Sequence, residues 1–238
     1  MTKSDPELIV DLISSALGDK NRNKKIFLNE PDFNGSNANL YVNSCLDTGW
    51  VSTAGEFVSR FESELESFTG ASKAIAVTNG TVALRLALYL LGVRNGDEVL
   101  VPPLSFVATC NAISHLGATP HFIDIDRKNL GMDPICLDNH LNQISEYKNG
   151  LLINKITGKK ISAICPVHVF GNPANCIELK KISDKWSIPM VEDAAEALGS
   201  YISDKHCGLI GKIGILSFNG NKIITTGGGG ALITDDIK

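Results

Sequence analysis

From residue 73 onward, short apolar runs alternate with longer stretches in which apolar residues recur at helical spacing. The short runs predict seven strands, at 73–77, 98–101, 119–123, 161–167, 189–191, 213–218 and 231–234. The longer stretches predict helices at 81–91, 106–116, 135–144 and 174–186. Strands that alternate with helices form a mainly parallel sheet covered on both faces. The pattern therefore predicts an α/β fold with a seven-stranded, mainly parallel sheet sandwiched by helices.

The N-terminal part of the chain follows a different pattern. Residues 4–17 show helical spacing and are followed by Gly18, which predicts a short helix. Ser4 and Glu7 fit a capping box at its start. Residues 19–49 are polar and rich in Asn and Gly, so we expect an irregular arm there.

A further helix is predicted at 53–68, where Thr53 and Glu56 fit a second capping box and aromatic residues recur on one face. We expect those aromatic side chains to pack in the core. The predicted organisation is an N-terminal helix and arm at 1–49 followed by one large domain at 50–238.

Composition excludes several classes of function. The 238 residues carry a net charge of −4, so no basic surplus is present to neutralise a nucleic-acid backbone. The N-terminus lacks the basic start and apolar core of a signal peptide, and no apolar run reaches membrane-spanning length. The six cysteines form no C-x-x-C pair, so we predict reduced thiols, no metal site and a cytoplasmic location.

Ligands of an open α/β sheet collect at the carboxyl ends of its strands, which makes the segments after the strands the place to look. Thr78-Asn79-Gly80-Thr81 follows the first strand. Gly80 lets a phosphate approach the backbone, Thr81 offers a hydroxyl, and the helix N-terminus offers free N–H groups. An ordinary turn with Thr81 as the helix cap is an equally good interpretation of this segment alone.

Two further strand ends carry candidate residues. Phe106 follows the second strand and is suited to lie on a planar ring, although a core aromatic is the more common interpretation. Asp193 follows the fifth strand, where a buried carboxylate needs a partner such as a protonated pyridine nitrogen. The alternative is that Asp193 caps the next helix.

The segment after the sixth strand runs from Ser217 to Lys222 and precedes four glycines at 227–230. Ser217 can share a phosphate, and a lysine beside a cationic ring loses its proton more easily, which suits imine formation. A lone lysine is more often a solvated surface charge. The glycines match no P-loop, and no G-x-G-x-x-G follows the first strand, so common nucleotide cofactors are disfavoured. His168, after the fourth strand, receives no catalytic role.

Taken together, these segments resemble a known family. The ordered motifs are Thr78-Asn79-Gly80-Thr81, Pro102 to Phe106, Pro166-Val167-His168, Val191 to Glu196 and Ser217-Phe218-x-x-x-Lys222. Their order resembles that of the DegT/DnrJ-type sugar aminotransferases, which are pyridoxal 5'-phosphate (PLP) enzymes of the aspartate-aminotransferase fold (fold type I). The resemblance runs from about Leu46 to the last residue.

The resemblance implies roles for individual residues. Lys222 looks like the lysine to which PLP is covalently attached, and Asp193 looks like the partner of the pyridine nitrogen. Glu196 matches the position near the ring's 3-hydroxyl, which many relatives fill with Gln or His. Phe106 is similar to the aromatic residue stacked on the ring. Gly80, Thr81 and Ser217 resemble the phosphate contacts. Relatives with His at the lysine position run dehydration, so Lys222 implies transamination.

Gly49 to Ser52 and Gly220-Asn221-Lys222 look like the branch that aminates UDP-4-keto-6-deoxy-GlcNAc, with glutamate as the usual amino donor. The resemblance also implies a homodimer, and a small C-terminal domain that we expect this chain to lack. Relatives commonly have Glu in the glycine run, at Gly228. Two alternatives stay open: a non-catalytic fragment of such an enzyme, or a PLP-dependent sugar dehydratase or epimerase.

Overall fold

A computed structural model of the chain describes residues 4–17 and 30–236, and residues 1–32 and 33–238 form two separate compact units. The first unit contains α1 (Asp5–Leu17). The backbone N–H and the hydroxyl of Ser4 both donate to the Glu7 carboxylate at 2.9 Å, which confirms that Glu7 caps this helix. Gly18, the predicted end of the helix, lies outside the described residues.

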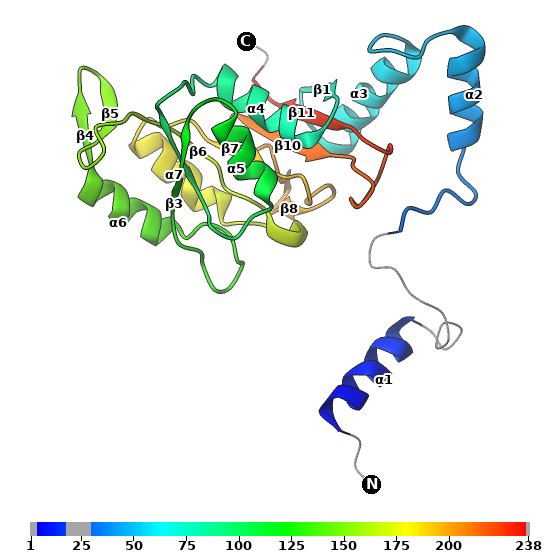
Figure 1. Cartoon of the computed structure of the whole chain (residues 1–238), viewed down its shortest axis with the longest axis horizontal. Helices are drawn as coiled ribbons and strands as arrows, with labels where there is room; N and C mark the ends of the chain where they lie inside the picture. Colours follow the sequence, from blue (N-terminus) through cyan, green and yellow to red (C-terminus); the bar gives the residue numbers. More distant parts are fainter. Residues whose placement is uncertain (1–3, 18–29, 237–238) are drawn as a thin grey trace. The chain divides into compact units, whose positions relative to one another are not determined.

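The second unit is built on the predicted seven-stranded sheet (Figure 1). Its strands are β1 (Lys73–Val77), β2 (Glu98–Val101), β3 (Thr119–Phe122), β6 (Ile161–Ile164), β7 (Val191–Asp193), β10 (Ile213–Ser217) and β11 (Gly230–Thr234). The strands form two groups, with the orders β1-β11-β10-β7 and β3-β2-β6. Parallel bridges from Ile164 to Met190 and from Val167 to Asp193 link the two groups into one sheet. Strand β11 is antiparallel to β1 and β10, and the other pairings are parallel.

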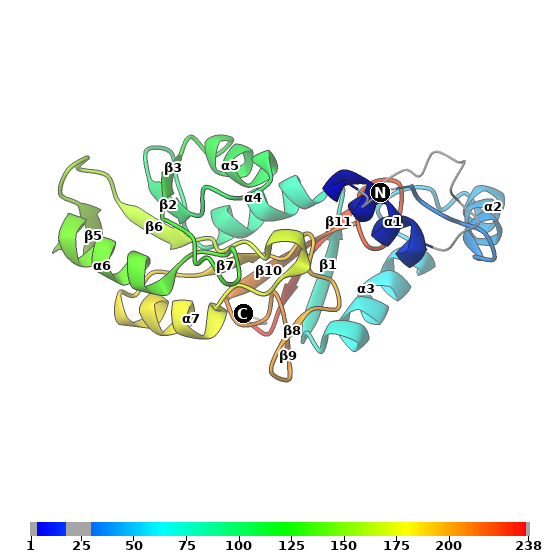
Figure 2. The same ribbon diagram turned by 90° about the horizontal axis from the view of Figure 1, so that it is seen from below.

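Helices cover both faces of the sheet, as the alternation of strands and helices predicted (Figure 2). The helices α4 (Gly80–Leu90) and α5 (Val107–Ser114) lie on one face, and α3 (Glu56–Thr69), α6 (Pro134–Ile144) and α7 (Cys176–Lys185) lie on the other. Successive side chains of β2 point to opposite faces of the sheet, as in any strand. Val99 and Val101 pack under α4 and α5, whereas Leu100 packs with α6 and α7.

Several elements depart from the sequence-based predictions. The predicted irregular arm contains a helix, α2 (Ala38–Thr48). Helix α3 begins after Gly55 without a side-chain cap, so the proposed capping box at Thr53 is wrong. Two short hairpins had no counterpart in the apolar pattern, namely β4 (Ser145–Lys148) with β5 (Leu151–Asn154), and β8 (Tyr201–Ile202) with β9 (Lys205–His206). Within the described ranges, no helix is both long and apolar enough to cross a membrane.

Candidate active site

A cavity of about 450 Å³ lies where the carboxyl ends of β1, β7 and β10 meet the N-termini of α4 and α5. Five separate chain segments contribute to its lining, each of which lies at or after the end of a strand. All seven residues singled out from the sequence line this one cavity: Gly80, Thr81, Phe106, Asp193, Glu196, Ser217 and Lys222. The topology rule for open α/β sheets therefore brings them together from positions far apart in the chain.

The N-terminus of α4 forms one end of the cavity. Asn79, rather than Thr81, is its cap, and the Asn79 side chain accepts a hydrogen bond from the Val82 N–H at 2.8 Å. Thr81 is therefore not used as the cap and lines the cavity. A Cβ at Gly80 would lie 2.9 Å from the Ser217 Cβ, so glycine is what allows the Ser217 hydroxyl to approach the first turn of the helix. N–H groups, a hydroxyl and the helix dipole make this end suited to an anion.

Asp193 is the last residue of β7 and is buried. Its Oδ2 accepts a hydrogen bond from the Thr109 hydroxyl at 2.7 Å, and its Oδ1 accepts one from the Ala195 N–H at 3.2 Å. Burial raises the pKa of the Asp193 carboxyl above its ordinary value, and these hydrogen bonds offset only part of that shift. Turns rather than a helix follow Asp193, so the alternative that it caps a helix is wrong.

Lys222 lies in the loop between β10 and β11, and its side chain is only 10% exposed. Its Nζ lies 3.2 Å from the Glu196 Oε1 and 5.6 Å from the centre of the Phe106 ring. The surface-charge interpretation of Lys222 is therefore wrong. Phe106 is 63% exposed and faces the cavity, so it is not a core residue either.

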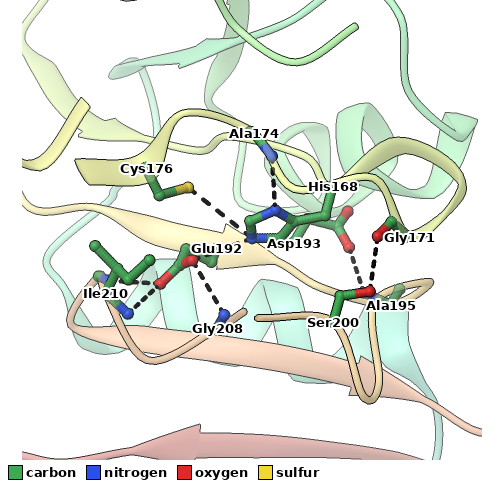
Figure 3. A network of polar contacts seen from close by, with 11 residues as sticks. His168, Gly171, Ala174, Cys176, Glu192, Asp193, Ala195, Ser200, Gly208 and Ile210 are labelled. Atoms are coloured by element: carbon green, nitrogen blue, oxygen red, sulfur yellow. Dashed lines mark hydrogen bonds and ion pairs between the residues drawn. The ribbon is translucent and has the colours of Figure 1, made fainter. Parts of the chain in front are cut away.

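A buried polar network that contains Glu192 and His168 lies beside Asp193 (Figure 3). Glu192, the preceding residue, accepts hydrogen bonds from the backbone N–H groups of Gly208, Ile210 and Gly211. The Ala174 N–H donates to His168 Nδ1, so the His168 Nε2 carries the proton that it donates to Glu192 at 3.1 Å.

Burial alone would raise the pKa of Glu192, but the hydrogen bonds from His168, Gly211 and Gly208 hold that pKa below its ordinary value. Cys176 Sγ lies 3.9 Å from His168 Nε2, so Cys, His and Glu ligand atoms converge. The hydrogen bonds to Glu192 and His168 account for this cluster without a metal ion. All six cysteines are free thiols, and Cys176 is one of the three that are buried.

Sequence reasoning assigned no role in the site to other residues that line the cavity, among them Asn79, Thr109 and Phe170. Asn79 carried a usable signal, because Asn before a helical stretch is a preferred cap. Thr109 carried none, since it lies inside α5 and reaches a partner 84 positions away. Phe170 lies in a short 3-10 helix, Val169–Gly171, which is too short to produce a periodic apolar pattern in the sequence.

A larger cavity, of about 880 Å³, is lined by α2, α3, the segment that joins them, the end of β1 and the glycine-rich segment that leads into β11. It is lined largely by apolar side chains such as Leu46, Trp50 and Val51. This larger cavity contains none of the seven candidate residues, all of which line the smaller one. Cavity size alone therefore does not identify the candidate active site.

Comparison with known proteins identifies the family. Residues 33–238 match the DegT/DnrJ/EryC1/StrS aminotransferase family. The chain belongs to this family. It is 39% identical over 196 residues to GDP-perosamine synthase of Escherichia coli O157:H7, covering 82% of this chain and 50% of that protein. It is 38% identical over 213 residues to the putative pyridoxal phosphate-dependent aminotransferase EpsN of Bacillus subtilis, covering 90% of this chain and 52% of that protein.

Solved structures of the DegT/DnrJ/EryC1/StrS aminotransferase family share the fold. An aminotransferase of this family from Brucella abortus superimposes with a TM-score of 0.76 at 30% identity, over 84% of this chain and 51% of that one. The predicted fold class is thereby confirmed. The chain spans about half the length of the curated relatives it matches.

Proposed function

We propose that this protein is a PLP-dependent aminotransferase that moves an amino group from an amino acid to a nucleotide-linked keto sugar. One arrangement carries the proposal. Lys222 and the buried Asp193 line the same cavity as the N-terminus of α4, which is suited to an anion. A lysine, a strand-end carboxylate and a phosphate cradle are the three groups that bind PLP at its aldehyde, its ring nitrogen and its phosphate.

The residues present fit this cofactor. Asp193 is an anion that burial disfavours, and a protonated pyridine nitrogen is a cation that would offset that cost. The close approach of Gly80 and Ser217 leaves a hydroxyl and helix N–H groups at the end suited to a phosphate. Phe106 offers an exposed aromatic face between them. In this proposal Gly80, Thr81 and Ser217 hold the phosphate, Phe106 stacks on the ring, and Glu196 lies beside the ring's 3-oxygen.

The chain's own residues then have distinct tasks. Bound PLP supplies an electron sink for the negative charge that forms at the amino acid's α-carbon. Asp193 keeps the ring nitrogen protonated, which strengthens that sink. Lys222 binds the cofactor covalently until an amino acid displaces it, and its freed Nζ then removes the α-carbon proton as a general base. The same Nζ would deliver that proton to the cofactor, and in the second half-reaction it would carry a proton from the cofactor to the sugar carbon that receives nitrogen.

The proposed acceptor is a nucleotide-linked 4-keto-6-deoxy hexose, and the proposed donor is glutamate. The sequence resemblance favours UDP-4-keto-6-deoxy-GlcNAc. The names of the relatives support a GDP-linked sugar as a second candidate acceptor, since two of the matching proteins are GDP-perosamine synthases. Both acceptors therefore belong in the test. A role in polysaccharide biosynthesis agrees with the spore coat polysaccharide biosynthesis protein SpsC of Bacillus subtilis, which is 36% identical over 195 residues.

The test uses the complete natural protein. After incubation with PLP and reduction with borohydride, mass spectrometry should find the cofactor on Lys222, and Lys222→Arg should remove it. A covalent adduct at another lysine contradicts the assignment of Lys222, whereas the absence of any adduct favours the non-catalytic alternative. Incubation with ¹⁵N-glutamate and each keto sugar should place ¹⁵N on the sugar. A deoxygenated or epimerised product without nitrogen would identify a dehydratase or epimerase instead.

The homodimer and the cytoplasmic location stay predictions. Sedimentation of the complete protein should give the mass of two chains, and a concentration-independent monomer contradicts the dimer. Cell fractionation tests the location.

A further inference from the structure

Phe170 combines two properties that do not stabilise a folded protein. Its side chain is 83% exposed, so the ring contributes almost no burial. Its backbone has φ 54° and ψ 25°, in the left-handed region that bulky side chains avoid. The backbone conformation costs free energy that the exposed ring does not offset, and such strain is found chiefly at functional sites.

The surrounding structure imposes this conformation. The Phe170 N–H donates to Glu196 Oε2 at 2.9 Å, and the Ser200 hydroxyl donates to the Gly171 carbonyl at 2.7 Å. A Cβ at Gly171 would lie 2.7 Å from the Glu196 carbonyl oxygen, so this segment is packed closely against the segment after β7. The unfavourable backbone of Phe170 is thus held by contacts on both sides.

These contacts place Phe170 next to the reactive group of the cavity. Glu196 binds the Phe170 N–H through Oε2 and Lys222 Nζ through Oε1. One carboxylate therefore separates the Phe170 backbone from Lys222. Among the described residues, five non-glycine residues have a positive φ, and Phe170 is the one of them that lines the cavity.

We propose that the Phe170 ring is the binding platform for the apolar face of the acceptor's hexose, with the C–H groups of the 6-deoxy sugar packed on the ring. This inference rests on the proposed function. The keto carbon that receives nitrogen must come close to Lys222 Nζ, so the hexose, rather than the nucleotide, lies nearest to Phe170. Aromatic rings provide a large apolar contact area at low cost in conformational entropy.

The two half-reactions of the complete, PLP-loaded protein test the proposal. Donation of the amino group by glutamate and its transfer to the keto sugar are each followed by the cofactor's absorbance. Phe170→Ala should raise KM for the keto sugar by about tenfold to a hundredfold, which corresponds to the loss of a buried Phe contact. The effect on the glutamate half-reaction should be at least about tenfold smaller, because that substrate lacks the hexose.

Three further variants exclude a structural explanation. Phe170→Tyr keeps the ring and should retain KM within about threefold. Phe170→Gly removes the ring but suits the backbone, so it should raise KM as Phe170→Ala does, without lowering the unfolding temperature. Phe122→Ala removes another exposed Phe, 54% exposed on β3 and outside the cavity, and should leave both half-reactions unchanged.

The proposed role of the Phe170 ring would be wrong if Phe170→Ala raised KM equally in both half-reactions. It would also be wrong if this variant left the KM for the keto sugar unchanged. Failure of the wild-type protein to accept the amino group of glutamate would overturn the proposed function itself. The two failures are distinguishable because the first is seen in a variant and the second in the unaltered protein.

Discussion

The hydroxyl of Thr109 donates a hydrogen bond to the buried carboxylate of Asp193 at 2.7 Å, across 84 positions of the chain. Thr109 lies in the first turn of α5 and Asp193 ends β7, so this bond joins a helix to the sheet at the floor of the cavity. It stabilises the ionised carboxylate, which is the form that can pair with a pyridinium nitrogen.

Thr109→Val should weaken PLP binding by about tenfold, because loss of a hydrogen bond to a charged group leaves the Asp193 anion less stable. Fluorescence titration of the cofactor-free protein with PLP measures the effect. Thr109→Ser keeps the hydroxyl and is the matched control. Equal affinities of the Val and Ser variants would show that the hydroxyl has no role in binding.

Asp193 should make the cofactor-free protein less stable as the pH rises. The pKa of Asp193 is raised in the folded state, so the folded protein holds this proton more tightly than the unfolded chain does. The resulting stabilisation is present at low pH and is lost as pH rises from about 3.9 through the folded pKa. The free energy of unfolding of the wild type minus that of Asp193→Asn should therefore fall with pH in urea titrations. A difference that rises with pH contradicts this sign.

Glu192 should have the opposite dependence, since its pKa is lowered in the folded state. Its contribution is present above about pH 4.3 and is lost as pH falls through the folded value. Glu192→Gln should lower the free energy of unfolding at pH 7 by about 3 kcal/mol, because buried donors lose their acceptor. Glu178→Gln, which alters an exposed ion pair with Lys181, should cost less than about 1 kcal/mol. Similar losses in the two variants would argue against the importance of the buried network.

Gly80→Ala should impair the anion end of the cavity. The added Cβ would meet the Ser217 side chain at 2.9 Å, so either Ser217 or the start of α4 must shift. We expect PLP affinity to fall at least about tenfold. Gly220→Ala is the control, because a Cβ there meets no atom within 4 Å. Calorimetric titration of both variants with PLP compares them, and a normal affinity of Gly80→Ala would exclude close packing as the reason for this glycine.

The sequence allowed prediction of the elements that depend on local patterns. Buried runs such as 98–101 identify strands because neighbouring helices cover both sheet faces. Seven cavity residues could be chosen because strand ends converge in such a sheet. Contacts between distant side chains left no local signal: neither the Thr109–Asp193 bond nor the Glu196–Lys222 pair follows from spacing. Helix α2 was missed because Asn and Gly dominate the segment around it. Its apolar residues Tyr41, Val42, Cys45 and Leu46 do recur at helical spacing and line the larger cavity, although none of its residues is buried.

The pairing of β1 with β11 has a consequence for the order in which the fold is completed. Ser72, next to β1, donates its backbone N–H to Asp235 across 163 positions, and Lys73 pairs with Thr234. Strand β11 also closes the loop that carries Lys222, since it pairs with β10 on its other edge. Contacts of such high sequence separation form late, because a long loop must close before they gain any energy. During synthesis, β1 therefore stays unpaired on this edge until β11 has been made. Lys222 reaches its final position only when β11 has paired with β1 and β10.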